Sequence, residues 1–174
     1  MRRARALKVP DILRDVLAPG LRLVICGSAA GTRSAQLRQY YAGPGNKFWP
    51  TLHEVGLTPR RLVPAEFPLL LEFGIGLTDV IKDQSGPDAQ LDFRRADPDA
   101  LRAKIVRHAP RWLAFSSKRA AQEFLGRKKL AYGPQNESVG QTRIFVATSP
   151  SGRAGSYWDI GVWHALAALV KASG

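Results

Sequence analysis

The chain has 174 residues, and its 26 lysines and arginines outnumber 14 aspartates and glutamates, so that the net charge is +12. This length is typical of one domain, spanning 1–174, with a core of its own. The single cysteine, Cys26, excludes an internal disulfide and a cysteine-ligated zinc or iron–sulfur site. The charge favours nucleic acid as a partner, because a positive field attracts polyanions.

The start of the chain and its apolar runs indicate where the protein resides. Residues 1–10 form a basic arm that can touch a polyanion, and they lack the hydrophobic segment of a secretion signal. No apolar run is long enough for a membrane span. We therefore expect a cytoplasmic protein that does not enter a membrane.

The first elements lead into a loop of small residues. Ile12, Leu13 and Val16 form one apolar stripe, which predicts a short helix over 10–17. The apolar run 21–26 predicts a buried strand, and 27–31 (GSAAG) a turn whose backbone a ligand can approach closely. A buried strand followed by such a loop is typical of a site at the carboxyl edge of a parallel sheet.

Helices and strands then alternate along the chain. Behind a polar loop and the Gly-Pro-Gly-Asn turn, Phe48, Leu52 and Val55 indicate a helix that ends at Gly56. The further elements expected are strands over 112–115 and 144–147, helices over 97–109, 117–125 and 157–171, an exposed loop over 82–96 and turns over 131–141. This alternation predicts an α/β protein with a mostly parallel sheet in three layers.

Two further stretches border the expected site. Gly74-Ile75-Gly76 predicts a tight turn, from which Asp79 points into the adjoining cleft. The strand over 144–147 leads into a second loop of small residues, 148–156 (TSPSGRAGS).

Four motifs in this order, GSAAG, YYAGPGNKFW, GIGLTDV and SPSGRAGS, resemble those of the uracil-DNA glycosylase superfamily. The likeness is greatest to its mismatch-specific uracil/thymine branch and spans most of the chain. It implies a uracil-DNA glycosylase-like fold and an enzyme of base excision repair. Such enzymes flip a nucleotide out of DNA, hold its base in a pocket and hydrolyse the N-glycosidic bond without a metal or other cofactor.

The resemblance also assigns residues to the base pocket. Gly27, Ala29, Ala30 and Gly31 match the first catalytic motif, whose backbone lines the pocket. Tyr41 matches the aromatic position on which the flipped base stacks, and Tyr40 is a weaker candidate. Tyr41 stands in a glycine-flanked segment and belongs to no apolar stripe, so an exposed loop is expected for it.

The second small-residue loop matches the segment that contacts the DNA backbone and fills the vacated space. Ser149, Ser151 and Gly152 are the implied backbone contacts. Arg153 stands at the position of the wedge, where a planar guanidinium can stack on bases and pair with an orphaned base edge.

Catalysis is where the sequence departs from the branch. Ala29 replaces the asparagine that orients the water, and Ser149 replaces an asparagine or histidine. The Gly-Ser opening resembles the hypoxanthine-DNA glycosylase branch instead, which implies Asn46 as a substitute. Asp79 is a second candidate, because a carboxylate can activate water or stabilise a cationic sugar, and Ser28 can donate to a base carbonyl. Asn46 and Asp79 can also be cap or turn residues, and Ser28 can simply satisfy its own loop.

Three functions remain open at this point. The resemblance implies a monomeric, monofunctional glycosylase for uracil, and for other deaminated bases, in single- or double-stranded DNA. The two missing side chains leave room for a protein of the same fold that binds uracil or abasic DNA without cleavage. A nucleotide-binding metabolic enzyme is a third reading, although the Gly-x-Gly-x-x-Gly and Gly-Lys-Ser patterns are absent.

Overall fold

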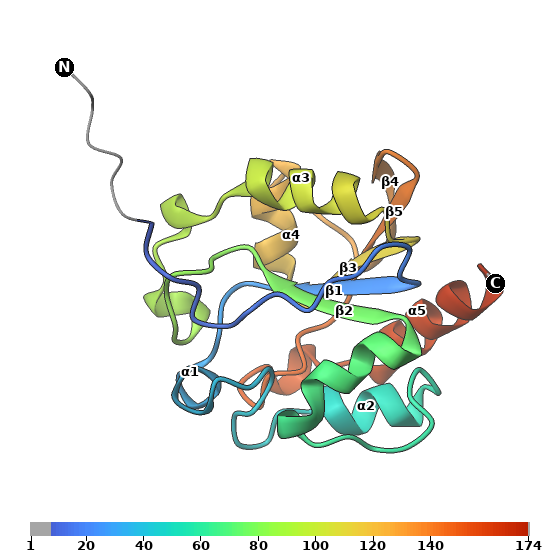
Figure 1. Ribbon diagram of the computed structural model, residues 1–174, viewed down its shortest axis with the longest axis horizontal. Helices are drawn as coiled ribbons and strands as arrows, with labels where there is room; N and C mark the ends of the chain where they lie inside the picture. The colour runs from blue at the N-terminus through green and yellow to red at the C-terminus, as the bar shows by residue number, and fades with distance from the viewer. Residues whose placement is uncertain (1–7, 174) are drawn as a thin grey trace.

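The computed structural model describes residues 8–173, so most of the predicted basic arm lies outside the described residues (Figure 1). A five-stranded sheet forms the middle layer, in the order β2-β1-β3-β5-β4. Its strands are β1 (Leu23–Gly27), β2 (Ile75–Asp79), β3 (Trp112–Phe115), β4 (Gly133–Val139) and β5 (Thr142–Val146). All neighbours pair in parallel except β4 and β5, which are antiparallel. The predicted α/β class with a mostly parallel sheet is confirmed.

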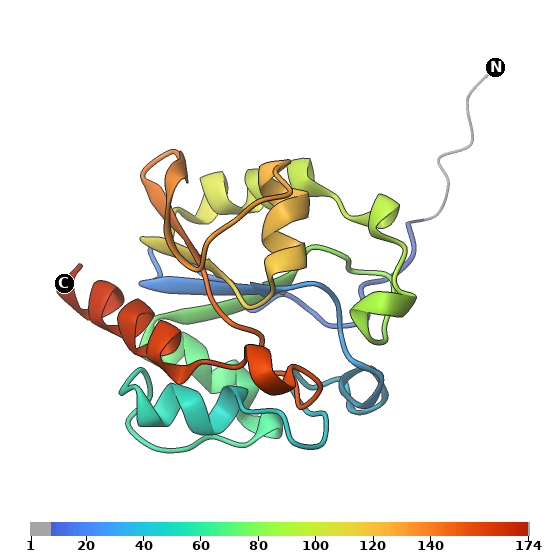
Figure 2. The ribbon, with the colours of Figure 1, turned by 180° about the vertical axis from the view of Figure 1, so that it is seen from behind.

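Helices cover both faces of the sheet (Figures 1 and 2). One face carries α2 (Phe48–Glu54), the 3-10 helix η1 (Pro64–Phe73) and α5 (Ile160–Ala172), and the other carries α3 (Pro98–His108) and α4 (Lys118–Leu125). Alternate residues of β1 divide between the two cores: Leu23 and Ile25 face α2 and α5, whereas Val24 and Cys26 face α3 and α4. Every residue of β1 is buried, which is why the strand reads as a continuous apolar run.

Local signals in the sequence placed α3, β3 and α4 correctly. The Asp97 side chain accepts from the Ala100 N–H at the start of α3, and the Ser117 side chain accepts from the Ala120 N–H at the start of α4. The strand predicted over 112–115 coincides with β3. Trp163, Leu166, Ala167 and Val170 face inward from α5 as expected.

The helix predicted over 10–17 was wrong. This segment runs beside the edge strand β2, where Val16 forms an antiparallel bridge with Leu77. The contact is so close that a Cβ on Gly76 would lie 2.5 Å from the carbonyl oxygen of Val16. Pairing with the sheet edge satisfies the backbone and buries the apolar stripe at the same time.

Other boundaries also moved. The turns predicted over 131–141 contain β4, and the polar loop after Gly31 contains a short helix, α1 (Thr32–Leu37). The loop over 82–96 includes two 3-10 turns, η2 (Asp88–Gln90) and η3 (Phe93–Arg95). The last helix begins at Ile160, because 155–157 form a separate 3-10 turn, η4. Within residues 8–173, no helix combines the length and apolar character needed to cross a membrane.

Candidate active site

A cleft of about 670 Å³ lies at the carboxyl ends of the parallel strands, where the segments that follow β1, β2, β3 and β5 meet. It brings together every site residue that the sequence suggested. These are Gly27, Ser28, Ala29, Ala30, Gly31, Tyr41, Asn46, Asp79, Ser149, Ser151, Gly152 and Arg153. Their individual roles remain predictions, but their convergence is a property of the fold.

Gly27 is closely packed where β1 meets the cleft. A Cβ at this position would lie 2.8 Å from Asp79 Oδ1, 3.4 Å from the Tyr41 hydroxyl and 3.5 Å from Ser116 Oγ. Any larger residue would collide with the carboxylate, so glycine is required here. Three polar groups from three different segments therefore converge on the end of β1.

Asp79 is the last residue of β2 and pairs in register with Gly27. The prediction that Asp79 lies in a turn was wrong, because Ile75, Gly76 and Asp79 all belong to strand β2. Asp79 also caps none of the helices described. Asp79 is buried, with only 7% of its surface exposed. Burial raises the pKa of this carboxyl to about 6; the negative charge of Asp15 adds to the shift, while the positive charges of Lys82 and Lys104 oppose it.

Tyr41 is not in an exposed loop, which corrects the sequence-based expectation. Its ring stacks on that of Phe48, with centroids 3.8 Å apart and planes 14° from parallel. Its hydroxyl lies 2.8 Å from Ser116 Oγ, and its backbone is left-handed, with φ of 52°. Burial raises the pKa of Tyr41, so the hydroxyl stays protonated. Tyr40 belongs to the core, since it is 2% exposed and donates to the carbonyl of Arg14.

Asn46 lies where the 43–46 turn enters α2. Its Oδ1 accepts from the Phe48 N–H at 2.9 Å, which is the cap-like role considered from sequence. Because that bond uses the oxygen, the side-chain nitrogen is the group that can donate to a ligand in the cleft. The structural and functional roles of Asn46 are therefore compatible.

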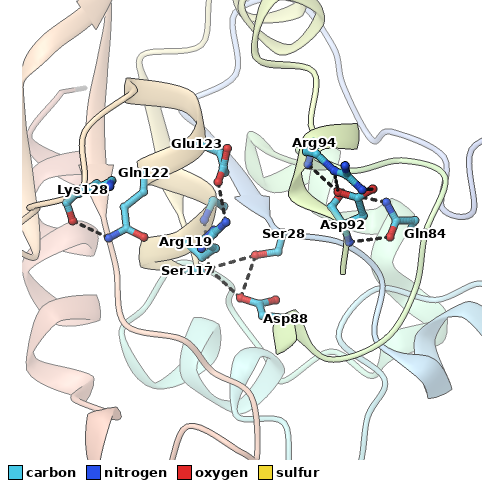
Figure 3. Close-up of polar contacts among 11 residues, drawn as sticks. Ser28, Gln84, Asp88, Asp92, Arg94, Ser117, Arg119, Gln122, Glu123 and Lys128 are labelled. Carbon is cyan, nitrogen blue, oxygen red and sulfur yellow. Dashed lines mark hydrogen bonds and ion pairs between the residues drawn. The ribbon is translucent and has the colours of Figure 1, made fainter. Parts of the chain in front are cut away.

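Ser28 is part of a polar network that sequence reasoning did not find (Figure 3). Its hydroxyl donates to Asp88 Oδ2 at 3.2 Å and lies 3.1 Å from Ser117 Oγ. Although Asp88 is largely exposed at the cleft wall, partial burial of its carboxyl raises the pKa of that group. Ser117 could have been found from sequence, because it follows a predicted strand, whereas no local pattern singles out Asp88.

The second small-residue loop, 148–156, directly contacts the 43–46 turn. Gly152 packs on the 43–46 turn so closely that a Cβ would lie 2.8 Å from the Pro44 carbonyl oxygen, and Lys47 N–H donates to the Pro150 carbonyl at 2.8 Å. Within the second loop, Ser151 Oγ accepts from the Arg153 N–H. This bond fixes the turn and leaves the exposed Arg153 side chain at the rim of the cleft.

Residues 14–169 match the family model of the Uracil DNA glycosylase superfamily. The chain belongs to this superfamily. Its fold is also similar to the solution NMR structure of a protein from Methanosarcina acetivorans that was provisionally assigned as a uracil DNA glycosylase. The TM-score is 0.60 at 19% sequence identity, over 91% of this chain and 96% of that one.

Membership in the uracil DNA glycosylase superfamily makes DNA the partner and glycosidic-bond hydrolysis the type of reaction. The distribution of charge agrees with such a partner. Arg33, Lys118, Arg119 and Arg153 line the outer cleft, whereas the carboxyl of Asp79 lies at its buried end. The cations at the outer cleft suit a polyanionic partner, because they attract phosphate groups.

Proposed function

We propose that this protein is a monofunctional uracil-DNA glycosylase of base excision repair, which removes uracil and other deaminated bases. We place it nearest the mismatch-specific uracil/thymine branch, with a divergent first motif. The observation that carries this proposal is the buried Asp79 carboxyl, which adjoins the pocket loop 27–31 in a cleft that the DNA-contact loop helps to line.

Asp79 supplies what the missing asparagine would otherwise provide. As the bond from the sugar carbon to the base nitrogen breaks, its electron pair leaves with the base and positive charge develops on the sugar. The ionised carboxylate stabilises that charge and accepts a proton from the water whose oxygen bonds to the sugar carbon. Ala29 can then be tolerated, because the general base comes from the neighbouring strand instead.

The network around Asp88 is suited to hold the base. Uracil presents an N–H flanked by two carbonyl oxygens, and a carboxylate accepts from that N–H. Ser28 and Ser117 lie against Asp88 Oδ2 and set its orientation. We assign Asp88 to base recognition and Tyr41 to the aromatic wall of the pocket.

One assay tests the proposed reaction. Oligonucleotides that contain uracil, a thymine mismatch, hypoxanthine or xanthine are incubated with the protein in the presence of a metal chelator, and abasic sites are measured. We expect abasic product from the uracil substrate, since the mechanism needs no metal or cofactor. If none of these bases is released, the protein is not a glycosylase for deaminated bases.

Asn46→Asp separates the two roles of Asn46. The substitution keeps an oxygen for the Phe48 N–H but removes the amide donor. We expect base release to fall by about 100-fold, the effect of losing one oriented donor, with little change in stability. Single-turnover assays and urea unfolding measure the two quantities.

Asn46→Ala is the matched variant, because it removes both the donor and the cap. It should also lower the free energy of unfolding by about 0.5–2 kcal/mol. Full activity in Asn46→Asp would mean that Asn46 acts only as a cap.

A second candidate function is favoured by Ala29 and Ser149, which lack the usual catalytic groups. In that case the protein binds uracil or abasic DNA without releasing a base. Gel-shift affinity for these sites, combined with no abasic product at high enzyme concentration, would favour binding alone. In either case we propose a monomer that acts in the cytoplasm.

A further inference from the structure

Two tyrosines at the rim of the cleft are unused by the proposed reaction. Tyr157 is 76% exposed and Tyr132 is 37% exposed, and both line the cleft. Tyr157 is the most exposed of the large apolar side chains described. A single exposed aromatic residue is ordinary, but two on one cleft indicate a contact surface.

The backbone at Tyr157 is anchored by its neighbour, and the ring of Tyr132 has a direct partner. Tyr157 ends the 3-10 turn η4, and the next residue, Trp158, packs against the core and carries Lys47 Nζ 5.7 Å from its ring centroid. Lys118 Nζ lies 4.2 Å from the centroid of the Tyr132 ring. Burial, and secondarily the nearby Tyr157, raise the pKa of Tyr132, which agrees with the two phenols sharing one side of the cleft.

The surrounding charges indicate what these rings contact. Lys118, Arg119 and Arg153 line the same cleft, so an anionic polymer can lie along the rim. Aromatic side chains in a basic groove bind single-stranded nucleic acid by stacking on its bases. In a paired duplex the base faces are already covered by their neighbours, whereas a single strand offers them freely.

We infer that Tyr132 and Tyr157 form a stacking surface for unpaired DNA bases beside the target nucleotide, so that this chain holds single-stranded DNA directly. The inference deepens the proposed function and rests on it for the identity of the target. It gives the rim two separate contacts: the tyrosines hold unpaired bases, and Arg153 fills the space left in a duplex.

The test uses undamaged DNA, so that it does not depend on base release. Binding of the full chain to a fluorescent oligo-dT strand, and to the same strand paired with oligo-dA, is measured by anisotropy. Tyr157→Ala should weaken single-strand binding by about 5- to 150-fold and duplex binding by less than about threefold. Tyr157→Trp, which keeps a stacking ring, should bind the single strand about as tightly as the wild-type protein does.

Two further variants act as comparators. Arg153→Ala should weaken binding to a duplex that carries an abasic site more than binding to the single strand, the opposite order to Tyr157→Ala. Val106→Ala changes another exposed apolar side chain, on α3 outside the cleft, and should alter neither affinity.

The outcomes separate this inference from the proposed function. Equal losses on both forms of DNA in Tyr157→Ala, or no loss on either, would overturn the stacking surface even if uracil is released. Selective loss on the single strand would support it, and would do so even if no base were released by the wild-type protein.

Discussion

Asp79→Asn should reduce base release by about 100- to 10,000-fold at pH above about 7, the range expected when a general base is lost. The carboxyl lies at the buried end of the cleft, with its pKa raised to about 6, so it is ionised under these conditions. Wild-type activity should fall as the pH drops below about 6, because protonation removes both the base and the negative charge. Single-turnover rates across pH measure both effects, and the variant should lack this pH dependence.

The same substitution should stabilise the fold at high pH. The pKa of Asp79 is about 6 in the folded chain against an ordinary value of 3.8, so folding favours the protonated form. The contribution of Asp79 to stability is therefore complete at pH values below the pKa of the unfolded chain, and it is lost as the pH rises through the folded pKa of about 6. Asparagine avoids the buried charge, and we expect a gain of about 2–3 kcal/mol near pH 8 that shrinks towards zero near pH 4. Urea unfolding at both pH values measures the gain.

Asp15→Asn is the matched control, for which we expect a loss of stability instead of a gain. Burial alone would raise the pKa of Asp15, but Lys82, Lys104 and a hydrogen bond from Thr78 outweigh it and lower the pKa. The ionised Asp15 therefore stabilises the fold at pH values above the pKa of the unfolded chain, and this stabilisation is lost as the pH falls through the lowered pKa of the folded chain. Removing the carboxylate leaves two lysines without their shared partner, and the variant should lose about 1–3 kcal/mol at neutral pH. Activity of Asp79→Asn within a few-fold of wild type would contradict the catalytic assignment of Asp79. A loss of stability near pH 8 in the same variant would contradict its raised pKa.

Gly152→Ala should lower base release by about 100-fold, the scale of a displacement of about 1 Å in a catalytic site. Its methyl group would lie 2.8 Å from the Pro44 carbonyl oxygen and 3.3 Å from the Gly45 carbonyl group. Both neighbours are backbone, so the loop over 148–156 and the 43–46 turn must move apart. The cost in stability should be about 1–3 kcal/mol, typical of an overpacked contact. Abasic-site formation and urea unfolding give the two values.

Gly43→Ala provides the comparison within the same turn. A Cβ there meets nothing within 4 Å, and the backbone is not left-handed. The variant should therefore keep its activity within a few-fold. If Gly152→Ala behaves in the same way, close contact between the two loops is not needed for the reaction.

The amino-acid sequence alone determined the features that short-range chemistry encodes. The continuous apolar runs predicted the buried strands β1 and β3, and Asp97 and Ser117 marked the starts of α3 and α4. The small-residue loops after two strands predicted a shared site, because parallel strands place their carboxyl ends at one edge. The order of the motifs carried the superfamily, which the match over 14–169 shows.

Only the tertiary structure decided how the site is built. The segment over 10–17 is extended because an edge strand, far away in the sequence, offers it a partner. Asp88 reaches Ser28 across 60 residues, and Tyr41 is partly buried because its ring stacks on Phe48. The pKa of Asp79 depends on burial and on charges brought near it by folding. Propensity and capping act over a few residues and can be read along the chain, whereas desolvation and long-range contacts exist only once distant segments have packed together.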